Sequence, residues 1–174
     1  MLDRVLDGGR ALMAMDEATW RRHANPWSVW SRVVTPIPLM TLALWSRVWI
    51  DWWFLIPVLA VAAWVWWNPR AFPPPTRWDG WPQRGVLGEK AVIEHRDAVP
   101  AHHRTAMTWT TAFAGLGALI WTYGVMVLDL GAAVGGGLAS VGFKLWFVDR
   151  CAWALADLER AGVIDPAASA RGEV

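Results

Sequence analysis

The sequence has few charged residues and a single cysteine, and each shortage excludes a class of protein. Charged residues make up 18% of the 174 residues, below the roughly 25% typical of soluble domains. The one cysteine, Cys151, cannot close an intramolecular disulfide, which excludes a disulfide-rich secreted domain. Lys and Arg number 16 against 15 Asp and Glu, without a block of like charge, so a nucleic-acid partner is not expected. Instead, 55% of the residues are hydrophobic and 16 are Trp.

Four long apolar runs predict four membrane-spanning helices. They are Val33–Ser46, which extends back to Trp27 if Arg32 reaches the headgroups, Trp52–Trp67, Thr105–Leu128, and Leu130–Phe143, which extends to Val148. The third run has 24 residues and is about 36 Å long as a helix, enough to cross a bilayer. Helices satisfy their own backbone groups in lipid, and short turns join the runs in pairs. The expected fold is all-α: an integral membrane bundle of four transmembrane helices, in two helical hairpins, with an N-terminal interfacial helix.

These runs divide a single membrane domain, residues 1–174, into five segments. They are a cytoplasmic or interfacial segment (1–26), the first helical hairpin (27–67), a cytoplasmic segment containing Pro and Trp (68–104), the second helical hairpin (105–148), and a cytoplasmic C-terminal helix and tail (149–174). Asn25 is expected to cap a helix that has Pro26 in its first turn, and Pro69 is expected to end the second span. Gly85–Lys90 is compatible with a helix or a strand, and we expect this segment to pack under the bundle.

Lysine and arginine are distributed unevenly between the two predicted sides of the membrane. Of the 16, only Arg47 lies in a turn on one side, and the remaining 15 lie in the N-terminal, middle and C-terminal segments on the other. Cytoplasmic flanks carry the excess of basic residues in membrane proteins. The pattern predicts a multi-pass protein of the inner (cytoplasmic) membrane with both termini in the cytoplasm. Tryptophans near the ends of the runs suit the headgroup level.

Polar side chains on the predicted cytoplasmic side form the candidate functional site. They are His23, Asn25, Arg70, Arg84, Glu89, Asp149 and Arg150. A site for a substrate or ligand would require these groups to converge in one pocket under the bundle. Ionisable residues of the spans lie only near their ends, at Arg32, Arg47, Asp51, Asp129 and Lys144. A charge in the middle of a span usually marks an ion or substrate path, so a transporter or channel is disfavoured.

Specific catalytic, metal and phosphate motifs are not found. Adjacent histidines such as His102 and His103 are expected to diverge on a helix and so not to chelate a metal. A metal site built from Glu89, Glu94, His95 and His102 lacks a recognised ligand spacing, and solvated polar residues are the expectation there. The run from Gly85 through Gly88 and Glu89 to Lys90 does not match a P-loop. The sequence therefore assigns no catalytic residue, no metal ligand and no cofactor, and leaves a bound pigment, haem or lipid open.

Small residues in the fourth run form a possible helix-packing face. They include Gly131, Gly135, Gly136 and Gly137. Small residues at every fourth position let helix backbones approach closely in a membrane. The spacing fits packing of the third and fourth spans against each other, and it equally fits docking of a second copy or another membrane protein.

Three motifs together resemble those of an uncharacterised family of small, Trp-rich prokaryotic integral membrane proteins. The motifs are His23–Arg32, with Asn25-Pro26-Trp27-Ser28 inside it; Asn68-Pro69-Arg70 with Phe72–Pro75 and Arg84–Glu89; and Lys144–Arg150 with Trp153. The resemblance covers about Trp20 to Asp157. It implies a membrane location, no known activity and no catalytic residues to assign.

Two functions remain in view. The first is a non-catalytic accessory or structural subunit that packs in a larger membrane assembly. Its partners would be the lipid bilayer and other membrane-protein subunits or a second copy of itself. The alternative is a membrane-interface enzyme, or a small-molecule or lipid binder, that uses the cytoplasmic polar side chains. Whether the chain is an enzyme is left undecided.

Overall fold

The computed structural model describes residues 16–173, and every regular element in that range is a helix. The helices are α2 (Glu17–His23), α3 (Pro26–Val34), α4 (Pro36–Trp45), α5 (Arg47–Ile50), the 3-10 helix η1 (Asp51–Phe54), α6 (Leu55–Ala71), α7 (Trp81–Glu94), the 3-10 helix η2 (Arg96–Ala98), α8 (Ala101–Val127), α9 (Leu130–Arg160) and α10 (Pro166–Ser169). The predicted all-α class is confirmed for this range. Residues 1–15 of the predicted segment 1–26 lie outside the described residues.

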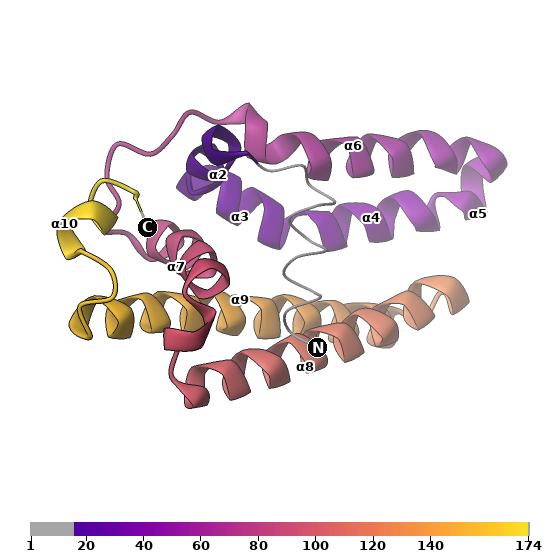
Figure 1. Ribbon diagram of the computed structural model, residues 1–174. Coiled ribbons are helices and arrows are strands. Elements are labelled where there is room, and N and C mark those ends of the chain that lie inside the picture. Colours follow the sequence, from indigo (N-terminus) through magenta and orange to yellow (C-terminus); the bar gives the residue numbers. More distant parts are fainter. Residues whose placement is uncertain (1–15, 174) are drawn as a thin grey trace.

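The first half of the chain folds back on itself. α3 and α4 lead to the short helices α5 and η1, where the chain reverses, and α6 returns beside α4 (Figure 1). Asp51 has a φ of 46° at this reversal, a conformation that few non-glycine residues adopt. Thr35 separates α3 from α4, because Pro36 has no N–H to continue the hydrogen-bond ladder of α3.

Two asparagines position the helices of this half. Asn25 Oδ1 accepts a hydrogen bond from the Trp27 backbone N–H at 2.9 Å and caps α3 as predicted. Asn68 is fully buried in α6; its Oδ1 accepts from Ser28 Oγ at 2.9 Å, and its Nδ2 donates to Ser31 Oγ at 2.8 Å. A buried polar group without a partner would cost about 1–3 kcal/mol. The amide therefore fixes the register of α6 against α3.

The prediction that Pro69 ends the second span is wrong. α6 continues through Pro69 to Ala71. Proline removes one backbone donor, and in the last turn of a helix that loss affects few hydrogen bonds. The side chain of the neighbouring Asn68, bonded to α3, holds this turn in place.

α8 and α9 run antiparallel with their backbones in close contact (Figure 1). A Cβ atom at Gly117 would lie 2.6 Å from the Ser140 backbone nitrogen, and a Cβ at Gly136 would overlap the backbone nitrogen of Trp121. Small residues make such close approach possible. Leu128 ends α8 in the left-handed conformation, with a φ of 62°, and the chain then enters α9.

Three ranges of helical residues are long and apolar enough to cross a membrane: Pro26–Ala71, Ala101–Val127 and Leu130–Arg160. The first range has 46 residues and contains the reversal at Asp51. The two chain reversals, at α5 and between α8 and α9, lie at the same end of the molecule (Figure 1). α2, α7 and α10 gather toward the opposite end.

Hydrogen bonds tie the two helical pairs together. Near the reversals, Arg47 Nη2 and Trp45 Nε1 donate to the Val125 carbonyl of α8 at 2.8 and 3.1 Å. Further along, Trp121 Nε1 donates to Thr41 Oγ1 at 2.8 Å. The bonds from Arg47 and Trp45 satisfy the Val125 carbonyl, which lies in the last turn of α8, where carbonyls lack a partner within the helix.

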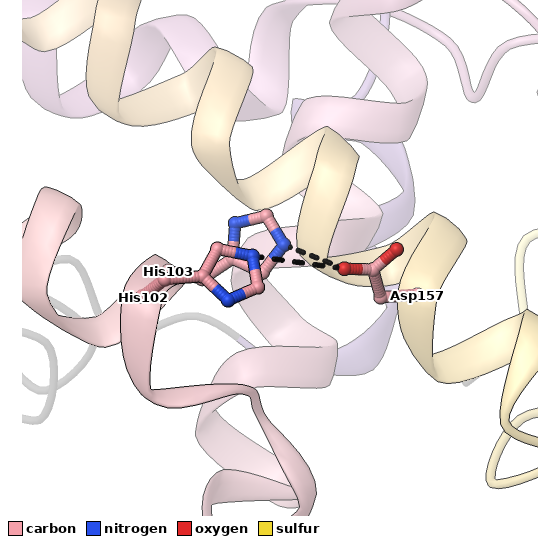
Figure 2. Close-up of side chains that lie close together, drawn as sticks. All are labelled: His102, His103 and Asp157. Carbon is pink, nitrogen blue, oxygen red and sulfur yellow. Dashed lines mark hydrogen bonds and ion pairs between the residues drawn. The ribbon is translucent and has the colours of Figure 1, made fainter.

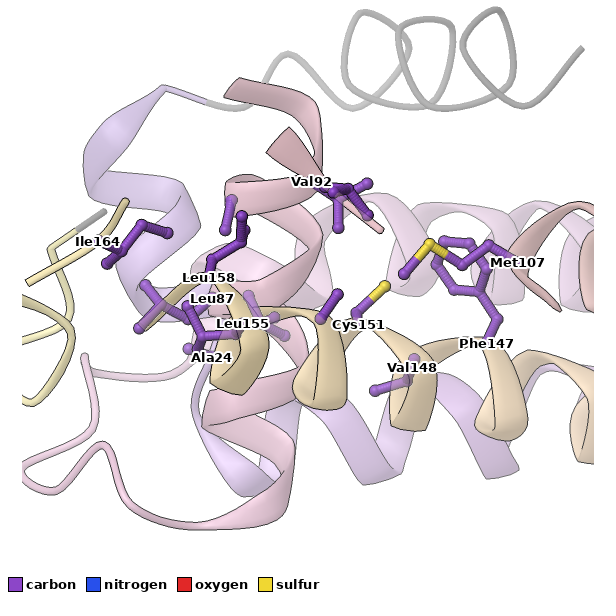
Figure 3. Packing of buried hydrophobic residues seen from close by; sticks show 14 of the residues in the cluster. Ala24, Leu87, Val92, Met107, Phe147, Val148, Cys151, Leu155, Leu158 and Ile164 are labelled. Carbon is purple, nitrogen blue, oxygen red and sulfur yellow. The ribbon is translucent and has the colours of Figure 1, made fainter. Parts of the chain in front are cut away.

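The buried hydrophobic core lies where α7 and α2 pack against the C-terminal half of α9 (Figure 3). Leu87, Leu155 and Leu158 are each at most 4% exposed. Glycines bring α7 close: a Cβ at Gly88 would overlap the Cys151 carbonyl. The segment that the sequence left open between helix and strand is therefore a helix, and its glycines serve helix packing.

Substitution of glycine by alanine, which adds one methyl group, tests which glycines carry the α8–α9 contact. We expect Gly136→Ala to destabilise the protein by about 1–3 kcal/mol, because the new Cβ would overlap backbone rather than a flexible side chain. Gly135→Ala is the matched control, since a Cβ there meets nothing within 4 Å. Unfolding of both variants in detergent micelles measures the difference. Equal stability of Gly136→Ala and wild type would contradict the packing argument.

Candidate functional site

A cavity of about 190 Å³ lies between α3, α4, α7 and α9. Its apolar lining comprises Val29, Val33, Pro36, Ile37, Val86, Val141 and Val148. Its polar lining comprises Arg32, Glu89, Ser140 and Lys144. A cavity of about 150 Å³ admits benzene, so this one has room for a group of several non-hydrogen atoms. The four helices thus border a partly open cavity with both apolar walls and charged groups.

Each charged side chain reaches the cavity from a different helix. Arg32 lies in the last turn of α3, Glu89 follows the close-packed Gly88 of α7, and Lys144 lies midway along α9. Lys144 Nζ is 3.7 Å from Glu89 Oε1. Two cations and one carboxylate leave the lining with a net formal charge of +1. This balance favours an anionic ligand.

His23 lies behind Arg32 and is only 3% exposed. Arg32 Nη2 is 2.6 Å from Nε2 of the ring, and Nη1 contacts Nδ1. Burial, together with the positive charges of Arg32 and Lys144, holds the pKa of His23 well below its ordinary 6.5. The ring is therefore neutral at pH 7, and one of its nitrogens can accept a hydrogen bond from the guanidinium.

Three more of the predicted site residues, Arg84, Asp149 and Arg150, make their side-chain contacts away from the cavity. Arg84 donates to both carboxylate oxygens of Glu159, at 3.2 and 2.7 Å. Asp149 Oδ1 accepts from Trp81 Nε1 at 3.1 Å, and its Oδ2 accepts from Arg150 at 3.2 Å. The bonds of Arg84 and Trp81 join α7 to α9 and are structural ties between these two helices. The Asp149–Arg150 contact lies within α9.

The last two predicted residues, Asn25 and Arg70, lie near the end of α6 and the segment that follows it. Asn25 Nδ2 donates to the Pro73 carbonyl at 3.0 Å. Arg70 lies over the Trp66 ring, with its guanidinium carbon 4.2 Å from the ring centre. The seven predicted side chains therefore do not converge in one pocket. Glu89 lines the cavity and His23 supports it through Arg32. Of the other five, Asn25, Arg84 and Asp149 bond to other segments, while Arg70 and Arg150 contact residues of their own helices.

Sequence reasoning noticed Arg32 and Lys144 as ionisable residues at span ends and did not assign them to the site. The available signal was that both lie on the same predicted side of the membrane, where a predicted span meets the segments rich in basic residues. The sequence alone did not show that α7 places Glu89 next to Lys144. That contact depends on the glycine packing of α7 against α9.

The expectation that His102 and His103 diverge is wrong. Both rings lie beside Asp157 of α9 (Figure 2): His103 Nε2 is 2.9 Å and His102 Nε2 is 3.9 Å from Asp157 Oδ2. The two histidines are in the first turn of α8, and their rings turn toward each other, with centres 4.1 Å apart. The four-residue metal set is not assembled, because Glu89 lines the cavity and Glu94 is exposed at the end of α7.

The four predicted glycines of α9 lie in two kinds of environment. Gly136 contacts the α8 backbone, and a Cβ at Gly137 would lie 2.8 Å from the Ile37 side chain of α4. Gly135 faces open space, and Gly131 has only the nearby Asp129 side chain, 3.3 Å from a Cβ position. One side of this stripe packs within the chain, and the other side is unoccupied by the described residues.

The chain matches the family of unknown function DUF6653 over residues 9–172. It belongs to this family. The predicted resemblance to an uncharacterised family is thereby confirmed. No curated protein and no solved structure matches the chain. Membership of DUF6653 therefore brings no assigned activity, and function has to be argued from the geometry of the site.

Burial of His23 predicts a pH-dependent stability. Because the folded-state pKa is below 6.5, the unfolded chain binds a proton that the folded chain does not as the pH falls below about 6.5. The free energy of unfolding is therefore not reduced by His23 above that pH. Below it, the free energy of unfolding decreases by at most about 1.4 kcal/mol per pH unit. We expect His23→Gln to flatten the dependence between pH 5 and 6.5 in thermal unfolding in detergent. An identical slope in wild type and variant would contradict this role of His23.

Proposed function

We propose that this DUF6653 protein binds an anionic amphiphile, an acidic lipid headgroup in the first instance, in the cavity of α3, α4, α7 and α9. The observation that carries the proposal is the pairing of Arg32 and Lys144 with apolar walls in one cavity of about 190 Å³. A lipid headgroup needs cations for its phosphate and an apolar path for the adjoining chain. The proposal is of the same class as the ligand-binding alternative predicted from the sequence, but of the predicted polar residues only Glu89 lines this cavity.

The surroundings of the two cations support this assignment. The Lys144 side chain is 48% exposed, so an incoming anion can reach it. Arg32 is held from behind by the neutral ring of His23, which orients the guanidinium without neutralising it. Glu89 at 3.7 Å from Lys144 limits the net positive charge of the empty site and so the repulsion between the two cations.

We further propose that the chain crosses the inner membrane four times, with both ends in the cytoplasm. α3 and α4 have 9 and 10 residues with Thr35 between them, about 30 Å in all, and α6 would return across the same bilayer. α8 and α9 would form the second hairpin. The common side of the two chain reversals (Figure 1) and the excess of Lys and Arg in the other segments support this orientation.

Cysteine accessibility tests the orientation. In a Cys151→Ala background, we expect Trp49→Cys and Leu130→Cys, both at exposed positions near the reversals, to react with a membrane-impermeant thiol reagent added to intact cells. Thr76→Cys and Ala167→Cys, exposed near the opposite end, should react only after permeabilisation. Labelling of all four in intact cells, or of the second pair alone, would contradict the proposed topology.

Native mass spectrometry tests lipid binding. Protein released from membranes containing phosphatidylglycerol should retain this lipid in preference to phosphatidylcholine. We expect Lys144→Gln to weaken retention by about ten- to a hundredfold, the value of one hydrogen bond to a charged group. Arg77→Gln removes an exposed arginine paired with Asp79 outside the cavity and serves as the control. Equal retention by Lys144→Gln and wild type would contradict the site.

A structural role in a larger membrane assembly is the second candidate, and one observation favours it. Gly131, Gly135 and Gly142 lie on the exposed side of α9, and a Cβ at the last two meets nothing within 4 Å. Such a surface is suited to close approach by another helix. The same mass spectra distinguish the two functions, since a larger defined complex without bound acidic lipid would favour the structural role over the binding role.

A further inference from the structure

A second cluster of chemically capable side chains lies away from the cavity, where α8 begins beside the end of α9. His102 and His103 come from the first turn of α8 and Asp157 from the last turns of α9 (Figure 2). One ligand atom from each residue lies within 4.8 Å of the others. This is the one such group of three or more His, Cys, Asp or Glu side chains between residues 16 and 173.

We propose that His102, His103 and Asp157 form a binding site for a divalent transition-metal ion such as Zn²⁺. Zinc binds imidazole nitrogen and carboxylate oxygen at about 2.0–2.2 Å, which separates neighbouring ligand atoms by about 3.4 Å in a tetrahedral site. The two Nε2 atoms lie 2.9 and 3.9 Å from Asp157 Oδ2, on either side of this value. Small side-chain rotations would therefore suffice to accommodate the ion.

The surroundings orient the carboxylate for this role. Arg160 Nη2 donates to the other carboxylate oxygen, Asp157 Oδ1, at 2.7 Å. The Oδ2 atom is thereby directed toward the two rings. Hydrogen-bond partners of metal-binding carboxylates commonly orient them in this way. The two imidazole nitrogens favour a transition-metal ion over Mg²⁺ or Ca²⁺, which prefer oxygen ligands alone.

The two histidines differ in burial, and this difference places the metal site at the protein surface. The His103 side chain is 4% exposed and the His102 side chain is 69% exposed. The ion would be bound at the edge of the molecule, with three protein ligands and a remaining position open to water. Nδ1 of His103 is buried and has no hydrogen-bond partner among the described residues. Because a missing outer partner typically weakens a site by about 10–100-fold, we expect moderate affinity.

Metal titration of the purified full chain, freed of any histidine tag, tests the proposal. We expect one Zn²⁺ per chain by isothermal titration and elemental analysis, and Co²⁺ bound in its place should give visible d–d absorption. His102→Ala and Asp157→Asn should each weaken Zn²⁺ binding about tenfold or more. His95→Ala removes the histidine between α7 and η2, which lies outside the cluster, and this variant should bind Zn²⁺ as wild type does. Millimolar Mg²⁺ should not displace the ion.

The variants distinguish loss of a ligand from loss of fold. Because the His102 side chain is largely exposed, His102→Ala is expected to keep the wild-type circular dichroism and unfolding temperature in the absence of metal. Unchanged Zn²⁺ affinity in folded His102→Ala and Asp157→Asn would overturn the proposal, as would equal weakening by His95→Ala or absence of binding to wild type. None of these results depends on lipid retention at the cavity, so the two sites can fail separately.

Discussion

Close backbone contacts of α9 with two other helices determine the rest of the structure, and glycines make both contacts possible. Toward its start, Gly136 lies against the α8 backbone; toward its end, Gly88 of α7 lies against the Cys151 carbonyl. Both contacts lie within one continuous helix, because α9 runs without a break for 31 residues, about 46 Å. Helices this close leave no room to slide, because their backbones rather than flexible side chains are in contact. The side chains that α9 presents between the two contacts are therefore held at fixed positions.

The polar residues of the chain follow from this arrangement. α7 is held against α9, so Glu89 is brought to Lys144, and Arg84 to Glu159. α3 is held against α6 by the buried Asn68, which brings Arg32 to the same space from the other side. A cationic group near the membrane is costly unless it is paired or reaches water. Here one cation pairs with a carboxylate and the other lies against a neutral imidazole, which explains how both can remain close to the apolar walls.

The sequence predicted the helices well where local chemistry determines them. The predicted apolar runs fall in the three helical ranges that are long and apolar enough to cross a membrane, and Asn25 with Pro26 identified the start of α3. The prediction from Pro69 was wrong, because the side-chain hydrogen bonds of Asn68 outweigh the missing backbone donor. Those bonds join residues 40 and 37 positions apart in the sequence. The same reason limited prediction of the site. Glu89 was singled out, but its neighbours Arg32 and Lys144 come from helices far apart in the sequence.

The histidines show a different limit of sequence reasoning. Adjacent residues on a helix point about 100° apart, which argued against joint action by His102 and His103. That argument considers one helix alone. Because α8 is antiparallel to α9 and packed closely against it, both rings lie beside Asp157, with their centres 4.1 Å apart, and the one carboxylate faces both. Angular divergence on one helix is thus compatible with convergence on a partner.

The cavity and the histidine cluster share α9 but are too far apart for their occupants to touch. Lys144 and Asp157 are 13 positions apart, about 20 Å along a straight helix. Groups at that separation, with no shared partner, usually contribute independently to stability. A ligand in the cavity would hold α9 to α3 and α7, and a metal ion would hold it to α8, so each would stabilise the folded chain by its own binding free energy. Any coupling between them would have to pass through bending of α9, which the glycine contacts at both of its ends oppose.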